Sequence, residues 1–183
     1  MGQVGLTSLL VLFLFSERGW SAAAAALALG TVQLGGAAAR VIAGRWSDRT
    51  DQRIEPFRGL AAAAGALLLA AAALADAPDA LLVPVLMAGG MLAMSWNGLS
   101  FTAAAEISGG AQAGRAMGLQ NTVMRIAGAA APLALGALAA AVSWQAAFAV
   151  MGLAPLVGRA LLRPLVADED RRRRERHARL ASA

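Results

Sequence analysis

The stretch GRWSDRTDQR, residues 44–53, separates two long apolar segments of the chain. Its spacing is G-x-x-x-D-R-x-x-x-R, and the fixed positions are Gly44, Asp48, Arg49 and Arg53. Five of its ten residues are charged, whereas residues 59–75, which follow soon after, carry no charge. Such a change in polarity predicts a solvent-exposed connection between two buried segments.

The composition of the chain predicts a membrane protein. Of its 183 residues, 58% are hydrophobic and 15% are charged, whereas soluble domains are about 45–50% apolar and about 25% charged. The chain has no cysteine, which excludes disulfides and thiolate metal sites. Its single histidine, His177, lies in a basic tail. We therefore expect no enzyme activity, no catalytic or metal-ligating residues and no cofactor.

Apolar segments of suitable length define the predicted fold. A helix that crosses a bilayer needs about 20 apolar residues. Six candidate segments follow one another: Val4–Phe15, Ala22–Gly44, Gly59–Ala75, Ala80–Ala105, Arg115–Val142, and a last segment that ends near Leu162. The first has only about 12 to 15 residues, too few for a core of about 30 Å, and we interpret it as a truncated helix. The fold class is thus all-α, a polytopic membrane bundle over residues 1–165 with a hinge loop at 45–57, followed by a charged tail, 166–183.

The arginines predict the orientation of this bundle. All sixteen basic residues are arginine, and the net charge is +5. The turns after the first, third and fifth segments contain only Arg18, whereas the other turns hold Arg45, Arg49, Arg53, Arg58, Arg115, Arg163 and the tail arginines. Cytoplasmic loops are enriched in basic residues, so the 44–53 stretch and the tail are predicted to be cytoplasmic. This distribution fits topology signals better than a nucleic-acid-binding face.

The fifth segment carries a stripe of small and polar residues. At about 100° per residue, an arc of roughly 80° contains Gly118, Asn121, Arg125, Gly128, Pro132 and Gly136. Weaker stripes occur in the second segment, around Gln33, and in the fourth, around Asn97. Because polar groups avoid lipid, we expect the second, fourth and fifth segments to lie inside the bundle and the third and sixth to face lipid.

Four of the polar side chains are candidates for a substrate pathway. Counted from the cytoplasmic ends, Arg125, Asn97 and Gln33 lie about 14 to 17 Å deep, and Asn121 about 9 Å. Transporter sites commonly form near this depth. Arg125 is the candidate anion-binding or charge-relay residue. The alternative is that Arg125 pairs with a carboxylate outside the chain, or with backbone carbonyls, and only holds helices together.

The charged stretch and its position after the second segment resemble the loop signature of the major facilitator superfamily of membrane transporters. In that family, the signature lies on the cytoplasmic side between the second and third helices of each six-helix half. Other stretches resemble bacterial carboxy-terminal halves: Glu17–Ser21, Trp96–Gly98 with Glu106, Gly114–Thr122 and Pro132–Gly136. The resemblance covers nearly the whole chain before the tail.

The resemblance implies half of a twelve-helix carrier in a bacterial inner (plasma) membrane, moving a small solute by alternating access. It also implies that Asp48, Arg49 and Arg53 form charge contacts that hold one state, with Gly44 permitting close helix approach. A solvated loop that only sets topology is the alternative. Asp51-Gln52 departs from the family signature, and the fifth segment lacks the Gly-Pro pattern of drug antiporters. The substrate class suggested by Arg125 is an organic anion, and protons remain an open candidate as the coupling ion.

Three interpretations of a six-helix chain stay open at this point. It is a fragment that needs an amino-terminal half, a half-size carrier that pairs with a second copy, or a non-transporting membrane scaffold that binds partners. In each case the lipid bilayer is a partner.

Overall fold

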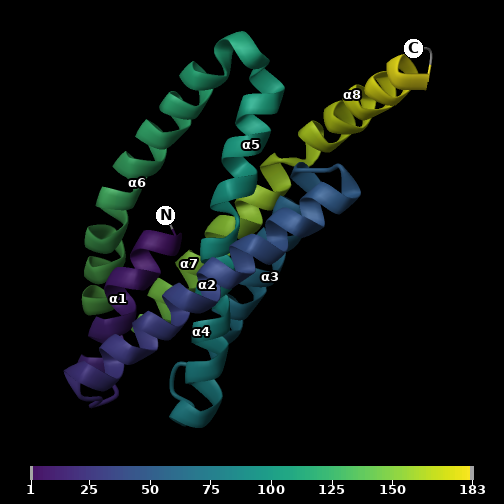
Figure 1. Ribbon diagram of the computed structural model, residues 1–183. Coiled ribbons are helices and arrows are strands. Elements are labelled where there is room, and N and C mark those ends of the chain that lie inside the picture. The colour runs from purple at the N-terminus through teal and green to yellow at the C-terminus, as the bar shows by residue number, and fades with distance from the viewer. Residues whose placement is uncertain (1, 182–183) are drawn as a thin grey trace.

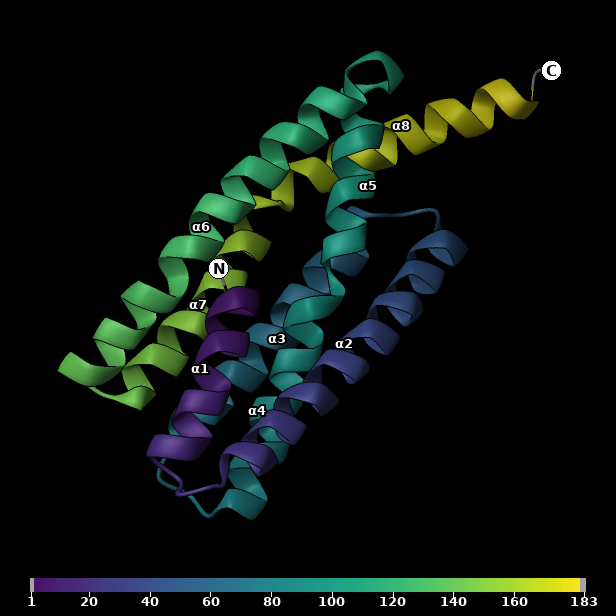
Figure 2. The same ribbon diagram turned by 60° about the vertical axis from the view of Figure 1, so that its left-hand side comes forward.

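The computed structural model describes residues 2–181, and that range is built from helices without strands (Figures 1 and 2). The α-helices in chain order are α1 (Gly2–Ser16), α2 (Ala22–Thr50), α3 (Ile54–Ala73), α4 (Asp79–Ser95), α5 (Asn97–Ser108), α6 (Ala113–Ala141), α7 (Trp144–Leu161) and α8 (Arg163–Ala181). A short 3-10 helix, η1 (Gly110–Gln112), precedes α6. The predicted all-α membrane bundle is confirmed.

Five stretches of the described chain are long and apolar enough to cross a membrane. They are α2, α3, α4 together with α5, η1 together with α6, and α7. Helix α1 is apolar but shorter, and its 15 residues extend only about 22 Å. The number and order of the segments agree with the prediction, including the short first helix.

Helix α1 lies at the centre of the bundle despite its length. Its side chains Leu6, Leu10, Phe13 and Leu14 are at most 2% exposed, and it contacts α2, α4, α6 and α7. The Phe13 ring meets Phe148 of α7 edge to face, with ring centroids 5.0 Å apart. Between apolar helices in lipid, such close packing is one of the main sources of attraction.

Helix α2 continues through most of the charged stretch. It ends at Thr50, and only Asp51–Arg53 separate it from α3. The prediction of a loop over 45–57 was therefore wrong for most of that range. No residue between 45 and 50 breaks a helix, and the Thr50 hydroxyl donates to the Trp46 carbonyl oxygen at 3.0 Å, as hydroxyl groups within helices do. Asp51 ends α2 in the left-handed conformation, with φ 49°.

The helices α2 and α6 are less buried than their polar stripes led us to expect. The buried share of the most apolar window is 44% for α4–α5 and 39% for α3, but 22% for α2 and 17% for α6. The predicted interior position of α2 and α6, and the peripheral position of α3, are thus wrong within this chain. The reason is that the polar side chains Gln33, Asn121 and Arg125 are exposed, and within the α6 stripe only Gly128 is buried.

Helices α3 and α7 approach each other closely at two glycines. A Cβ atom on Gly65 would lie 2.8 Å from the Gly152 carbonyl oxygen, and one on Gly152 would lie 2.9 Å from the Gly65 carbonyl oxygen. Near one end of the same pair, Arg58 and Arg159 each donate to the other's backbone carbonyl oxygen, at 3.3 and 3.1 Å. These contacts fix the α3–α7 pair as a rigid unit.

We predict that Gly152→Ala destabilises the protein. The new methyl group would meet backbone atoms that cannot move aside, and overpacking of this kind costs about 1–3 kcal/mol, or roughly 4–8 °C in the thermal midpoint for a loss of about 2 kcal/mol. The measurement is thermal unfolding in detergent. Gly158→Ala, on the same helix, is the control because no atom lies within 4 Å of its would-be Cβ. Equal midpoints for the two variants would contradict this packing.

Candidate functional site

A cluster of charged side chains surrounds Arg53 at the arginine-rich end of the bundle, where α2 meets α3 and where α5 ends. The Arg53 guanidinium donates from Nη1 to Asp48 Oδ1 at 2.6 Å and to Ser47 Oγ at 2.7 Å. Its Nε donates to Glu106 Oε1 at 3.2 Å. We call Ser47, Asp48, Arg53 and Glu106 the Arg53 cluster. Through it, one side chain joins the ends of α2, α3 and α5.

The Arg53 side chain is largely shielded, whereas its carboxylate partners reach water. Its exposed fraction is 18%, against 71% for Asp48 and 46% for Glu106. Burial is the largest single influence on the Arg53 pKa and acts to lower it, but hydrogen bonds and charges from Asp48 and Glu106 together raise the pKa above its usual range. The stabilisation linked to this shift is fully present at neutral pH and is lost as the pH rises through the raised pKa. Arg53 is therefore a permanent cation whose contacts change only if its partners move.

Helix α8 contacts the same end of the bundle. Glu169 accepts hydrogen bonds from the first backbone N–H groups of α3, and Arg173 pairs with Asp51. The tail, predicted only as a charged segment, is thus a helix that is packed against the α2–α3 connection.

The other two residues of the predicted gate, Gly44 and Arg49, lie apart from the cluster. Arg49 is exposed and makes no hydrogen bond or ion pair within the described part of the chain. The close helix approach expected at Gly44 is not found, because no atom lies within 4 Å of its would-be Cβ. Close approach on α2 occurs instead at Gly35 and Gly36, against Met91 and Met94 of α4. The reason is that α2 packs against α4 near the middle of α2, and Gly44 lies closer to the end of α2.

The predicted pathway residues are distributed over three helices. Gln33 of α2 and both Asn121 and Arg125 of α6 are exposed, whereas Asn97, the first residue of α5, is half-buried. Among the described residues, the side chains of Gln33, Asn121 and Arg125 make no hydrogen bond to one another. Helices α1 and α5 both contact α2 and α6, so the helices that carry these residues are linked through shared neighbours.

The α4–α5 junction interrupts the fourth span near these residues. Trp96 separates the two helices, and its ring stacks on Phe57 with centroids 5.3 Å apart and an interplanar angle of 12°. The Arg40 guanidinium donates to the Met94 carbonyl oxygen at 3.2 Å, so a cation meets the end of α4, where the helix dipole favours it. Arg40 therefore has a structural partner on the neighbouring helix.

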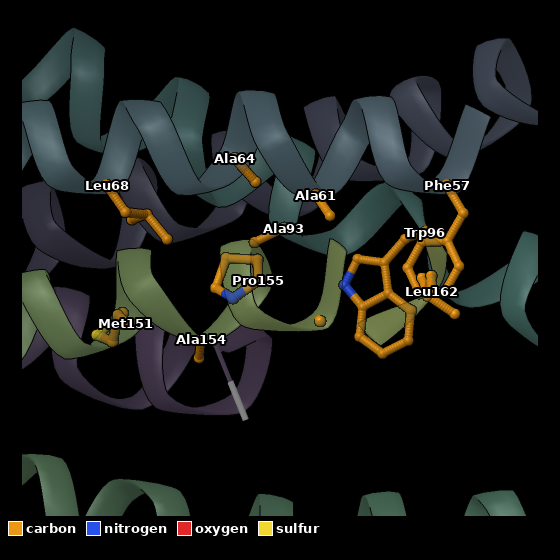
Figure 3. Close-up of a pocket in the computed structure, with 11 residues that line it drawn as sticks. Phe57, Ala61, Ala64, Leu68, Ala93, Trp96, Met151, Ala154, Pro155 and Leu162 are labelled. Carbon is orange, nitrogen blue, oxygen red and sulfur yellow. The ribbon is translucent and has the colours of Figure 1, made fainter. Parts of the chain in front are cut away.

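A cavity of about 290 Å³ lies between α3, the α4–α5 junction and α7. Figure 3 shows Phe57, Trp96 and Leu162 at one end of it and Leu68 and Met151 at the other. Its lining is apolar apart from the Trp96 indole and carries no charged side chain. A charged solute would lose its hydration there without compensation, so this cavity does not suit the predicted anion.

The opposite end of the bundle holds a second polar network. Asp79, at the start of α4, accepts a hydrogen bond from Trp20 Nε1 at 2.6 Å and pairs with Arg18 Nη1 at 3.5 Å. Gln145 Nε2, in the first turn of α7, donates to both carboxylate oxygens of Asp76 at 2.9 and 3.0 Å. The three turns at this end are thereby joined to one another.

Sequence reasoning missed several of these residues as site members. Glu106 was noted only as part of a resemblance. It is the only acidic residue in the sequence between Asp79 and Asp168, and this isolation could have marked it as a candidate. Ser47 lies within the quoted stretch. Glu169 had no usable signal, because it is one of several acids in the tail and its partners are more than 100 residues away.

We predict that Arg53→Gln destabilises the arginine-rich end. The change removes charge-assisted hydrogen bonds worth about 1.5–3 kcal/mol each before solvent screening, so the thermal midpoint should fall by roughly 4–8 °C. Arg49→Gln is the control and should change the midpoint by about 1 °C or less. The difference between parent and Arg53→Gln should be the same at about pH 7 and about pH 9, because the raised Arg53 pKa keeps the side chain charged. A difference that shrinks over this range would contradict the cluster.

Comparison with known proteins identifies the family. Residues 1–182 match the family model described as Major Facilitator Superfamily. An uncharacterised MFS-type transporter of Mycobacterium tuberculosis strain H37Rv is 37% identical over 156 residues, which is 85% of this chain and 35% of the relative. A second, from strain CDC 1551, is 36% identical over the same shares of both chains. The chain thus spans about a third of the length of these relatives, and no solved structure matches it. The chain is a multi-pass membrane protein that belongs to the Major Facilitator Superfamily of transporters.

Proposed function

We propose that this chain forms the carboxy-terminal half of a carrier that moves a small solute across the membrane by alternating access. The observation that carries the proposal is the chemistry of α6. This helix has two exposed faces, one apolar and one polar, and only the apolar face suits lipid.

The apolar face of α6 contains Leu119, Ile126 and Leu133, which are 69, 67 and 78% exposed. The polar face, with Asn121 and Arg125, is exposed as well, and at about 100° per residue it points more than 90° away from the apolar one. An arginine that faces hydrocarbon costs about 2.5–3.5 kcal/mol or more. The polar face therefore needs water, solute or another protein surface, and a transport path between two halves supplies all three.

Arg125 is the residue we propose to bind the solute, and its charge favours an organic anion. Asn121 lies one turn away on the same face, and we propose that Asn97 of α5 and Gln33 of α2 belong to the same path. If Arg125 instead pairs with a carboxylate of the other half, its substitution will destabilise the carrier without altering solute preference. A second copy of the chain is the alternative source of that other half, and protons are the proposed coupling ion.

The Arg53 cluster is the proposed gate. Its contacts link α2, α3 and α5 at the end that the arginine distribution assigns to the cytoplasm, with α8 on the same side. Ion pairs that form in one state and break in the other bias the equilibrium between states. Arg49 and Gly44 lie apart from the cluster, without close side-chain partners among the described residues, and we propose that they contact the other half in the closed state.

The chain is suited to a test of water access because it contains no cysteine. We predict that a cysteine at Asn121 reacts with a membrane-impermeant maleimide in membrane vesicles, whereas a cysteine at Ile126 reacts at least tenfold more slowly. Both positions lie on α6 within two turns of each other, so differences in depth are small. Comparable rates at the two positions, or a faster reaction at position 126, would contradict the proposal that the polar face borders an aqueous path.

Transport tests the role of Arg125. In proteoliposomes that contain the complete carrier, a panel of radiolabelled organic anions should include at least one that accumulates. We predict that Arg125→Ala lowers its uptake by at least about tenfold, because a hydrogen bond between the guanidinium and a charged solute is worth about 1.5–3 kcal/mol, and that Arg125→Lys retains part of it. Arg115→Ala, an exposed arginine on the same helix, is the control. Unchanged uptake in Arg125→Ala at normal protein levels would show that Arg125 does not belong to the path. If the parent protein takes up none of the anions, the result favours the alternative of a non-transporting membrane scaffold.

A further inference from the structure

The first turn of α3 lacks a cap of its own. Its N-cap residue, Arg53, makes no side-chain capping hydrogen bond, although the first N–H groups of a helix need acceptors. Glu169 of α8 provides them. Its Oε1 accepts from the Arg53 N–H at 2.5 Å, and its two oxygens accept from the Ile54 N–H at 3.2 and 3.1 Å. A carboxylate from the tail thus caps the helix that begins at the proposed gate.

The same turn of α8 contacts two further helix ends. Arg172 donates to the carbonyl oxygen of Ile107 at 3.1 Å, in the last turn of α5. Arg173 lies 3.8 Å from a carboxylate oxygen of Asp51, the C-cap of α2. The signs match the helix dipoles, since an acid lies at an N-terminus and a base at a C-terminus. Residues 169–173 therefore bridge the ends of α2, α3 and α5, the three helices joined by the Arg53 cluster.

We propose that Glu169 is a positioning residue for the gate and acts through Arg53. By holding the backbone of Arg53 at the start of α3, it places the guanidinium between Asp48 and Glu106. This inference rests on the proposed function of the Arg53 cluster as a gate. It adds that the docking of α8 against the α2–α3 connection controls the population of the closed gate.

The interface of α8 suits a contact that can be released. A cavity of about 70 Å³ lies beneath the helix, and both Glu106 and Glu169 line it together with Arg172 and Arg173. The contact thus combines hydrogen bonds and ion pairs with a few apolar residues, among them Ile107 and Leu165. A capping carboxylate changes a two-state equilibrium by about two- to thirtyfold, which is enough to shift the population of a gate.

A single cysteine can report whether α8 is seated. Ala103 is 6% exposed and lines the same cavity, so Ala103→Cys should react slowly with a membrane-impermeant maleimide while α8 covers it. In this background, Glu169→Gln should raise the reaction rate by about two- to thirtyfold. Asp170→Asn is the matched control, because it removes the same charge from the neighbouring position and Asp170 makes no hydrogen bond or ion pair within the described residues. Equal rates for the two variants would overturn the proposal.

A double-mutant cycle separates positioning of the gate from simple docking of α8. Glu169→Gln and Asp48→Asn are measured singly and together in the Ala103→Cys background. If Glu169 acts through Arg53, the combined change in rate should differ from the product of the single changes by more than about twofold. If the combined change lies within twofold of the product of the single changes, Glu169 only docks the tail. That result would overturn the positioning role.

The two levels of the proposal fail separately. The labelling cycle does not depend on transport, so it judges Glu169 even if no solute is moved. If Glu169→Gln is coupled to Asp48→Asn in the cycle but leaves uptake unchanged in a carrier that transports, the positioning role stands and the gate assignment is wrong.

Discussion

The structure depends on one constraint, which is that polar groups within a bilayer must face something other than lipid. Backbone groups meet it by forming helices, and the described chain is helical almost throughout. Side chains meet it by position. On α6, Leu119, Ile126 and Leu133 are exposed on one face and Asn121 and Arg125 on another, and on α2 Gln33 is exposed. Under the proposed function, the exposed polar side chains of α6 border the path through the membrane.

The two ends of the bundle are held in different ways. At one end, Arg18, Trp20 and Asp79 join neighbouring turns in direct contacts. At the other, Arg53 is shared between two exposed carboxylates, and α8 reaches the same place. Ion pairs at the ends of helices are among the contacts that are repacked in conformational switches. Rigid pairing of α3 with α7 through Gly65 and Gly152 then allows a change at this end to move helices as units.

Much of the fold was predictable because apolar length alone defines membrane helices. The short first helix and the polar turn at Ser16–Ser21 followed from the sequence. The positions of the helix ends could not be predicted from the sequence, because the end of α2 depends on the left-handed conformation of Asp51 and not on polarity. The exposure of α2 and α6 was also missed, since a polar stripe looks the same whether a neighbouring helix or an open region faces it. Asp48 and Arg53 were found from a local pattern, whereas Glu169 could not be, because its contact with α3 forms only in the folded chain.

The central claim is that the polar and apolar faces of α6 see different surroundings, and spin-label accessibility along this helix tests it most directly. Single nitroxides placed from residue 115 to residue 138 would be exposed to oxygen, which concentrates in lipid, and to a water-soluble nickel complex. The account predicts two opposed helical periodicities, with oxygen access greatest near Leu119, Ile126 and Leu133 and nickel access greatest near Gly118, Asn121 and Arg125. Oxygen access that is greatest on both faces would show that the polar stripe lies in lipid, and the account would then be wrong.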